Sequence, residues 1–320
     1  MQLVSYAEVR SLFLQAHRPL ILTGAGISTD SGIPDYRSPS GAYSRGHRPM
    51  THDEFCSSPA HRQRYWFRSM LGYPSFARAS ANAGHVAIAN MQRTGLISDL
   101  VTQNVDGLHQ KAGSEAVMEL HGSSHRVGCM HCRSVTPRVA LQRRLVAENH
   151  WWLRQAGVGS AHLQARIDPA QQRPDGDTEM RISKHDLQKF RVPACEVCGV
   201  GILKPSVTFF GDIVPEERAR RAKEAALSTD LFIVVGSTVS TYSAFRLVVS
   251  AAESGAAVLV LSDGDTRCER DGVPHFKMQT RCADVLPRLV ADLARRSGHR
   301  VPVARSMPHV PRKWTAETAG

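Results

Sequence analysis

The sequence is poor in lysine and in aromatic residues, and it has no long apolar run. Seven of its 40 basic residues are lysine, so the other 33 are arginine, and aromatic residues make up 6% of the 320 positions. No apolar run approaches the roughly 20 residues needed to cross a bilayer, and no secretory hydrophobic segment precedes the first predicted strand. We therefore expect neither association with a membrane nor a secretory leader.

Basic residues are also not concentrated in the sequence. No Lys/Arg-rich stretch of five to eight residues occurs, and basic and aromatic residues do not interleave as they do in proteins that bind single-stranded nucleic acid. The net charge is nevertheless +11 and the pI about 9.7. A basic surface can attract nucleic acid, an anionic cofactor or an acidic partner. An excess of arginine can also reflect the composition of the genome and a need for solubility. We therefore do not expect nucleic acid as a partner.

Cysteine is too scarce for a disulfide scaffold in a chain this long, and its spacing indicates a metal site in a reducing compartment. Four of the seven cysteines form two C-x-x-C pairs: Cys129, Cys132, Cys195 and Cys198. Four thiolates fill a tetrahedral zinc site and leave no position for water, so the ion would be structural. The 62 residues between the pairs indicate an insertion. Redox-active pairs are the alternative, which the presence of two pairs disfavours, and we expect His125 and His131 to be bystanders.

Several short apolar runs end in Gly, Ser, Thr, Asn or Asp, as buried strands of a parallel doubly wound sheet do. These runs are Pro19–Leu22, Leu96–Val101, Ala116–Leu120, Asp230–Val235 and Ala256–Leu261. We therefore predict an α/β fold with a Rossmann-like doubly wound parallel sheet and a smaller inserted zinc module. A ligand of such a sheet lies beyond the carboxyl ends of the strands.

Other segments carry weaker patterns. Near-helical apolar spacing predicts an amphipathic helix over residues 1–18. Residues 38–84 are polar and predict loops and short helices. The Pro- and Gly-containing stretch 168–177 predicts a mobile excursion, and the Pro-containing basic segment from about 298 onward predicts a disordered tail.

The first predicted strand stops at Gly24-Ala25-Gly26, a turn that would let backbone amides approach a pyrophosphate. Thr29 takes the place of the third glycine of the dinucleotide fingerprint, so the turn alone is a weak signal. The following residues 32–37 combine Pro and Asp with an aromatic residue and an arginine. We interpret them as a rigid loop that could fold over a bound ligand.

Polar residues follow two other predicted strands. Gln103, Asn104 and Asp106 come after the run that ends at Val101, and their amide and carboxylate groups suit the hydroxyls of a ribose. His121 directly follows Leu120, and an imidazole with an unperturbed pKa of about 6.5 suits proton transfer at neutral pH. His109 is the nearest alternative for this role. The remaining histidines are expected to have surface or capping roles.

Together these motifs resemble the sirtuins, a family of NAD-dependent protein-lysine deacylases. The resemblance runs in order from about residue 15 to 290 and covers the glycine turn, residues 32–37, Thr102–Asp106, His121-Gly122, both cysteine pairs, Leu203–Pro205, Phe209–Asp212 and Gly236–Thr238. Four features are similar to the class II, lipoamidase-type branch with mitochondrial and bacterial members: residues 63–66, the Val of Asn-Val-Asp, the long insertion, and Phe-Phe-Gly-Asp.

The resemblance implies one deacylase domain over residues 1–298, followed by a tail over 299–320. Within that domain, the NAD-binding Rossmann-like parts would cover about 1–44, 85–121 and 204–298. A helical or loop segment would cover 45–84, and the zinc module 122–203.

The resemblance also implies that NAD is a co-substrate lying across the strand ends, with one structural zinc ion. His121 matches the catalytic base, and Asn104 and Asp106 are expected to act beside it. The expected NAD contacts are Gly24, Ala25, Gly26, Ser28, Asp35, Tyr36, Arg37, Gln103, Asn104, Val105, Gly236, Ser237, Thr238, Ser262, Asp263, Gly264 and Cys282. A substrate peptide would add as a strand along Val207, Phe209, Phe210 and Gly211.

Two positions bear on affinity and specificity. Ser262 stands where relatives usually have Asn, so we expect weaker NAD binding, with Asp263 compensating in part. Tyr65 and Arg68 lie three residues apart on one predicted helical face, and in some sirtuins such a pair binds the carboxylate of an acyl group. A packed tyrosine and a solvated arginine is the alternative. If the pair binds an acyl carboxylate, the chain should prefer bulky or acidic acyl groups over acetyl, and this is our prediction.

The expected reaction releases nicotinamide, free lysine and 2′-O-acyl-ADP-ribose, with acyl-lysine proteins or peptides as partners. Mono-ADP-ribosyl transfer from the same site is the first alternative. A basic zinc-containing nucleic-acid binder and a module that senses NAD without turnover are the others. We expect a monomer in the mitochondrial matrix, with a bacterial cytoplasm as the alternative compartment.

Overall fold

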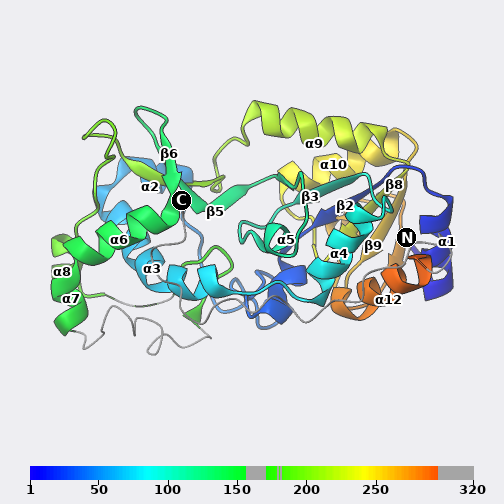
Figure 1. Cartoon of the computed structure of the whole chain (residues 1–320), viewed down its shortest axis with the longest axis horizontal. Helices are drawn as coiled ribbons and strands as arrows, with labels where there is room; N and C mark the ends of the chain where they lie inside the picture. Colours follow the sequence, from blue (N-terminus) through cyan, green and yellow to red (C-terminus); the bar gives the residue numbers. More distant parts are fainter. Residues whose placement is uncertain (156–170, 179, 181, 295–320) are drawn as a thin grey trace.

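The computed structural model describes residues 1–155, 171–178, 180 and 182–294. Figure 1 shows an elongated molecule with a large sheet toward one end and a small sheet toward the other. The large sheet has seven parallel strands in the order β1-β10-β9-β8-β2-β3-β4, and the small one has three antiparallel strands in the order β6-β5-β7. The predicted doubly wound parallel sheet is confirmed.

The large sheet contains β1 (Gln2–Leu3), β2 (Pro19–Thr23), β3 (Asp99–Thr102), β4 (Met118–Glu119), β8 (Leu231–Val235), β9 (Ala257–Leu261) and β10 (Phe276–Met278). Five of these strands fall on the apolar runs of the sequence. β1 and β10 were not predicted, because strands of two and three residues are too short to show a period. The prediction of one helix over residues 1–18 is therefore wrong at its start: the chain first adds β1 to the sheet, and α1 spans Tyr6–Gln15.

Helices cover both faces of the large sheet (Figure 1). α1, α4 (Ala83–Arg93) and α12 (Cys282–Ala294) pack on one face, and α9 (Glu216–Ser228) and α10 (Tyr242–Glu253) pack on the other. Alternate residues of β2 therefore enter two different apolar clusters, Ile21 on the α4 side and Leu20 and Leu22 on the α10 side. Each is fully buried, which stabilises the fold by about 1.5–3 kcal/mol per side chain.

Residues 38–84 are more regular than the predicted loops and short helices. After the short α2 (His52–Ser57), α3 spans Pro59–Arg78 and is 20 residues long. Ser58 caps it by accepting a hydrogen bond from the His61 amide, and Pro59 occupies the first turn, where no amide donor is needed. Polar residues and arginines between the buried aromatic residues obscured its period in the sequence.

The small sheet and its helices form the module that holds the cysteine pairs. It contains β5 (Gly122–Cys129), β6 (Val135–Pro137), β7 (Leu203–Val207), α6 (Arg138–Glu148), α7 (His150–Gln155) and α8 (Lys184–Lys189). β5 begins directly after His121, and the Thr208 amide that follows β7 donates to the His121 carbonyl at 2.9 Å. The module therefore leaves and rejoins the large sheet at a predicted site residue.

The stretch 168–177 differs from the predicted mobile excursion. Its residues 171–177 are packed: Gln172, Arg173 and Asp177 are each at least 93% buried, and an Arg173–Asp177 ion pair of 3.0 Å lies inside. A Cβ on Gly176 would lie 2.9 Å from the Phe76 ring of α3, so the glycine lets the segment press against that helix. Residues 168–170 and the predicted tail lie outside the described residues.

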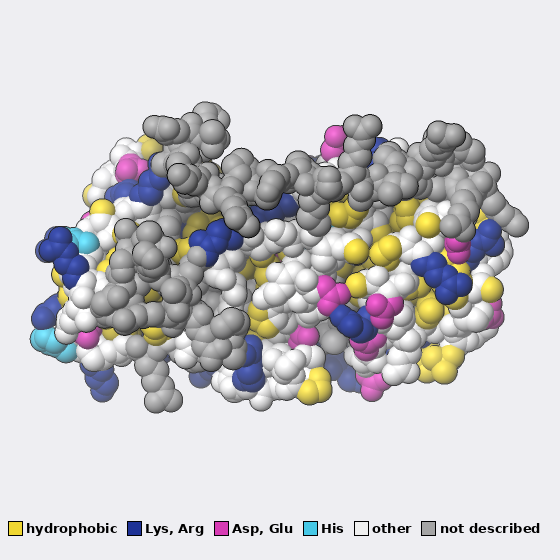
Figure 2. Space-filling model, turned by 60° about the horizontal axis from the view of Figure 1, so that its bottom comes forward, with side chains coloured by type: hydrophobic (Ala, Val, Ile, Leu, Met, Phe, Trp, Pro, Cys, Tyr) yellow, Lys and Arg dark blue, Asp and Glu magenta, His cyan; other side chains and the backbone are white. Residues whose placement is uncertain are grey.

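Charged side chains are mixed on the surface. On the face drawn in Figure 2, the Lys and Arg side chains of the described residues are scattered among acidic and uncharged ones and form no continuous stripe. Among the described residues, no helix combines the length and the apolar character that crossing a membrane would need.

Candidate functional site

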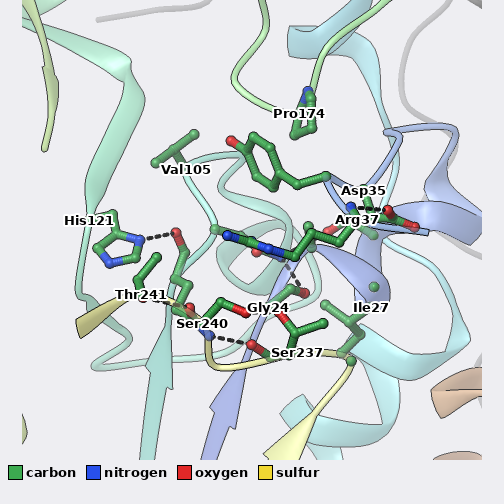
Figure 3. A pocket seen from close by; sticks show the side chains of 18 of the residues that line it. Gly24, Ile27, Asp35, Arg37, Val105, His121, Pro174, Ser237, Ser240 and Thr241 are labelled. Carbon is green, nitrogen blue, oxygen red and sulfur yellow. Dashed lines mark hydrogen bonds between the residues drawn. The ribbon is translucent and has the colours of Figure 1, made fainter. Parts of the chain in front are cut away.

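A cavity of about 1630 Å³ opens at the carboxyl ends of β2, β3, β8 and β9 (Figure 3). All the predicted NAD contacts line it, together with His121 and Asp106. The four residues of the predicted peptide edge line it as well. This is the place where ligands of doubly wound sheets bind, because the loops of several parallel strands meet there.

The glycine turn after β2 packs directly on the turn after β8. A Cβ on Gly24 would lie 2.6 Å from the Ser237 Cβ, and one on Gly26 would lie 2.8 Å from the Gly236 carbonyl oxygen. The Gly26 amide donates to that same oxygen at 2.8 Å. The two glycines are therefore needed for turn-to-turn contact, and they leave a floor with few side chains that suits a pyrophosphate.

The chain after this turn does not form the long helix of a standard dinucleotide fold. A short 3-10 helix, η1 (Ala25–Ser31), ends at Gly32, whose φ of 80° is left-handed. In the loop that follows, the Asp35 carboxylate accepts hydrogen bonds from the amides of Arg37 (2.9 Å) and Ser38 (2.8 Å). The Arg37 guanidinium lies 5.1 Å from the centre of the Tyr43 ring. These contacts hold the loop at the wall of the cavity (Figure 3), and its closing over a bound ligand stays a prediction.

His121 has a polar neighbour at each ring nitrogen, and Figure 3 shows one of the two contacts. Its Nδ1 lies 3.1 Å from the Gln103 carbonyl oxygen, which only accepts, so Nδ1 carries the proton. Its Nε2 then has a lone pair, which faces the Ser243 hydroxyl at 2.8 Å. Burial lowers the pKa of His121 to about 4, so the ring is neutral at pH 7. A neutral imidazole with a lone pair facing the cavity can act as a general base.

The residues after β3 form one hydrogen-bonded network. Asn104 donates to the Gly24 carbonyl at 3.0 Å and to the Ser28 hydroxyl at 3.1 Å. Ser28 donates to Asp106 at 2.7 Å, and the other Asp106 oxygen accepts from the Leu108 amide at 2.9 Å. This network ties the glycine turn to the end of β3. It keeps Asp106, which is 3% exposed, in one orientation.

Two buried histidines lie beneath this network. The rings of His85 and His109 are 4.9 Å apart, and each residue is at most 1% exposed. Burial lowers both pKa values, that of His85 to about 4, so neither ring is charged at neutral pH. His109 Nε2 contacts the Thr23 hydroxyl at 2.9 Å, not the cavity. The geometry therefore favours His121 over His109 as the base.

Sequence reasoning missed several cavity residues. Ser243, which contacts His121, lies in the first turn of α10 and had no motif to mark it. Pro174 and Asp175 reach the cavity from the inserted stretch, whose position the sequence does not indicate. The Ser124 hydroxyl donates to the Asp175 carbonyl at 2.9 Å and holds that stretch against β5.

Tyr65 and Arg68 both lie on α3, as predicted, but neither lines the cavity. Tyr65 is 5% exposed and packs against the rings of Phe55, Trp66 and Phe209. Arg68 is half-buried, and its charge acts on Asp177 of the inserted stretch. A role for these two residues in acyl binding stays a prediction.

The turn after β9 contains Ser262, the residue that stands where relatives usually have Asn. Ser262 is 8% exposed and lines the cavity, and Asp263 beside it is exposed. Cys282 starts α12, and burial raises the pKa of its thiol to about 12, so the thiol stays protonated. A buried protonated thiol packs as a small apolar group.

The two cysteine pairs come together as predicted. The sulfur atoms of the four cysteines lie within 4.8 Å of one another, with Cys129–Cys198 and Cys132–Cys195 separations of 3.7 Å. Four sulfurs at about 2.3 Å from a zinc ion in a tetrahedron are about 3.8 Å apart, so the donor set fits zinc. A Cβ on Gly201 would lie 2.1 Å from the Cys129 sulfur, so this glycine makes room for the cluster.

Comparisons with known proteins agree with this geometry. The model of the Sir2 family matches residues 24–243. The chain is 44% identical to NAD-dependent protein deacetylase 1 of Streptomyces coelicolor, over 90% of this chain and 89% of that protein. It is 41% identical to the mitochondrial NAD-dependent protein lipoamidase sirtuin-4 of Bos taurus, over 88% and 84%. A solved complex of Sir2 with a p53 peptide and NAD+ matches with a TM-score of 0.67 at 26% identity, over 91% and 99%.

Proposed function

Because the chain belongs to the sirtuin (Sir2) family, we propose that it is an NAD-dependent protein-lysine deacylase. NAD is the co-substrate, and the acyl group of an acyl-lysine is transferred to ADP-ribose with release of nicotinamide. The observation that carries the proposal is the position of His121. It is a neutral base whose Nε2 lone pair faces the Ser243 hydroxyl in the cavity, beside a glycine floor at the carboxyl ends of a parallel sheet.

Each part of the cavity has a proposed task. The turns at Gly24–Gly26 and Gly236–Thr238 hold the phosphates and the adenosine side of NAD, since their glycines let backbone approach the ligand. The loop carrying Asp35–Arg37 covers the bond to nicotinamide and excludes water from an oxocarbenium-like transition state. His121 removes a proton from the ribose hydroxyls, and Asn104 and Asp106 hold the ribose and the nicotinamide amide.

The peptide substrate is proposed to add along Val207–Gly211. This segment begins at the last residue of β7 and runs on beyond it, and Phe210, which is 45% exposed, lines the cavity. Main-chain hydrogen bonds give affinity with little demand on the peptide sequence, which suits an enzyme that reads one modified lysine.

The four cysteines would hold one structural zinc ion, and that ion would supply only cross-linking of the module, because no coordination position is left for water. The class II assignment is supported by the 41% identity to a lipoamidase. With the inserted stretch at the cavity wall, it favours bulky or acidic acyl groups over acetyl.

Product analysis tests the proposal. The purified chain is incubated with NAD and a panel of acetyl-, glutaryl- and lipoyl-lysine peptides, and products are separated by mass. We expect free lysine peptide, nicotinamide and O-acyl-ADP-ribose in equal amounts. ADP-ribose attached to a protein instead would favour mono-ADP-ribosyl transfer, and nicotinamide release without any acyl transfer would reject deacylation. No turnover at all would leave only NAD sensing.

The same panel tests the acyl preference. Arg68→Ala should reduce glutaryl turnover more than acetyl turnover if the arginine reaches the acyl carboxylate. An equal effect on both substrates would show that Arg68 supports the packing of the module and does not select the acyl group.

Compartment and assembly are also part of the proposal. All seven cysteines are free thiols, which fits a reducing compartment. Both the mitochondrial matrix, which we favour, and a bacterial cytoplasm provide one. We propose a monomer, which light scattering during size-exclusion chromatography tests directly. Nucleic-acid binding would appear as a DNA affinity that falls steeply with salt. The scattered basic residues of Figure 2 favour its absence.

A further inference from the structure

A second group of chemically complementary side chains lies beside the predicted peptide edge. The Cys56 sulfur is 3.4 Å from His52 Nε2, one helical turn earlier on α2. His52 Nδ1 is 3.3 Å from an oxygen of Asp212, and the other Asp212 oxygen accepts from Lys204 at 2.7 Å. A thiol, an imidazole and a carboxylate thus stand in a row. This is the order in which a nucleophile, its base and the group that orients the base are placed.

The proton positions in this row follow from the chemistry of the groups. Burial raises the pKa of Asp212, but its hydrogen bond to Lys204 and nearby positive charge outweigh this and leave the pKa below its usual value. Asp212 is therefore a carboxylate, and its negative charge 3.3 Å from His52 Nδ1 favours the tautomer with the proton on that nitrogen, through an ion-pair contact and not a hydrogen bond. His52 Nε2 then has a lone pair that faces the Cys56 thiol.

The thiol itself needs such a base. Cys56 is half-buried, and its burial raises the pKa of the thiol. The charges that face it are Lys204 and Arg62, which favour the thiolate, and Asp212 and Asp53, which oppose it. Because these charges oppose one another and burial has the largest effect on the pKa, the thiol is protonated at neutral pH. It becomes a nucleophile when His52 takes its proton.

Residues of this row are hydrogen-bonded to the predicted peptide edge. The His52 amide donates to the Phe210 carbonyl at 2.8 Å, and Thr51 forms a β-bridge with Phe210. Lys204 also donates to the Val207 carbonyl at 2.6 Å, and its ammonium lies 4.4 Å from the centre of the Phe209 ring. A group added to Cys56 would press on His52 and so shift the segment at Phe210.

We propose that Cys56 is a modification site at which a low-molecular-weight disulfide forms a mixed disulfide, with His52 as its base, and that this adduct weakens binding of the peptide substrate. His52 removes the thiol proton, and the thiolate attacks one sulfur of the disulfide. The S–S bond breaks, and the departing thiolate takes the proton back from His52. A reducing thiol reverses the exchange by the same route. The effect on the peptide rests on the proposed peptide edge, whereas the reactivity of Cys56 does not.

The reactivity is tested with hydroxyethyl disulfide on the zinc-loaded full chain, with adducts at each cysteine quantified by peptide mass mapping. We expect Cys56 to react at least about tenfold faster than the buried Cys268 and Cys282, and His52→Gln to slow Cys56 by a similar factor without changing the other two. The wild-type rate should change little between pH 7 and 8. The His52→Gln rate should rise with pH, as for an unassisted thiol.

This pH comparison separates a base from a structural residue, because mere packing would not change the profile. If the Cys56 rate in the wild type already rises about tenfold per pH unit, or is unchanged in His52→Gln, the assignment of His52 is wrong. The wild-type profile decides this even if the variant folds poorly.

The effect of the adduct on peptide binding is tested by steady-state kinetics. The adduct should raise the KM for an acyl-lysine peptide several-fold with little change in the KM for NAD, and dithiothreitol should restore it. Cys56→Ser should match the untreated wild type and resist the disulfide. Loss of activity that persists in Cys56→Ser, or that follows zinc release measured with a chromogenic chelator, would overturn the proposal. An untreated enzyme without deacylase activity would refute the proposed function instead, and the adduct rates would still test Cys56.

Discussion

The two ends of the molecule are stabilised in different ways. The parallel-sheet end, built on β1–β4 and β8–β10, buries two apolar clusters, one on each face of the sheet. The zinc-module end, built on β5–β7 and α6–α8, has one apolar cluster, which includes Cys129 and Cys195 themselves. The first end needs no metal ion, because these two clusters supply the buried apolar area that stabilises it. The second gathers four cysteine sulfur atoms within 4.8 Å of one another, a donor set that fits a structural zinc ion.

The difference matters because the cavity uses both ends. The glycine turns and Asn104 come from the parallel-sheet end, whereas the predicted peptide edge continues β7 of the zinc-module end. His121 stands at the boundary, on the residue before β5. NAD binding should therefore depend mainly on the first end, and peptide binding on the second.

Removal of zinc should produce the largest difference between the two ends of the molecule. A structural zinc contributes on the order of 10 kcal/mol, so a strong chelator should unfold the zinc-module end and abolish deacylation. NAD binding, followed by calorimetry, should persist in part because the two clusters of the large sheet need no metal. Equal loss of NAD and peptide binding would show that the ends do not fold independently. Cys195→Ser should reproduce the effect without a chelator.

His121→Gln should impair the chemical step without destabilising either end of the molecule. Loss of the base should lower kcat/KM by about 10²–10⁴-fold, while the melting temperature and NAD affinity stay near those of the wild type. Enzyme assays beside thermal denaturation measure the two effects. Activity close to that of the wild type would remove His121 from its proposed role, and His109→Gln would then be the next variant to test.

Asp177 allows a test by pH at the zinc-module end. Burial, and then the nearby Asp175, raise the pKa of Asp177 to about 7, above the value of about 3.9 in an unfolded chain. The folded state therefore binds a proton more tightly than the unfolded state. Stability from this group is full below pH 4 and is lost as the pH rises toward 7.

Denaturant unfolding of the zinc-loaded protein at several pH values between 5 and 8 measures this effect. Asp177→Asn should flatten the pH dependence relative to the wild type. An unchanged slope would show that Arg173 keeps Asp177 ionised throughout, as their 3.0 Å separation allows. Glu148→Gln is a matched control, because Glu148 is exposed at the end of α6.

Ser262→Asn should have the smallest effect of these variants, and the effect should be on NAD binding at the parallel-sheet end. A longer amide side chain in the turn after β9 should reach the ribose and tighten NAD binding by about one hydrogen bond, or 0.5–1.5 kcal/mol. The KM for the peptide should not change. No gain in NAD affinity would mean that Ser262, or the neighbouring Asp263, already makes this contact.

The parallel-sheet end was largely predictable, because its information is local. Five buried strands showed as apolar runs, and the polar residues after them lie together because parallel strands end at one edge. The 20-residue α3 and the packed stretch at Arg173–Asp177 were not predictable. Their burial depends on contacts between segments about 100 residues apart, such as Gly176 against Phe76. The contact of Ser243 with His121 joins residues equally distant in the chain.

The α/β class, the clustering of the four cysteines, the glycine turn and the place of His121 after a strand could therefore be predicted from the chain's residue types and their spacing. The tertiary structure decided which nitrogen of His121 faces the cavity and that Tyr65 is packed away from it. It also decided that Cys56, His52 and Asp212 stand in a row. The physical reason is the same in each case: hydrogen-bond partners and burial are supplied by distant segments that only the folded chain brings together.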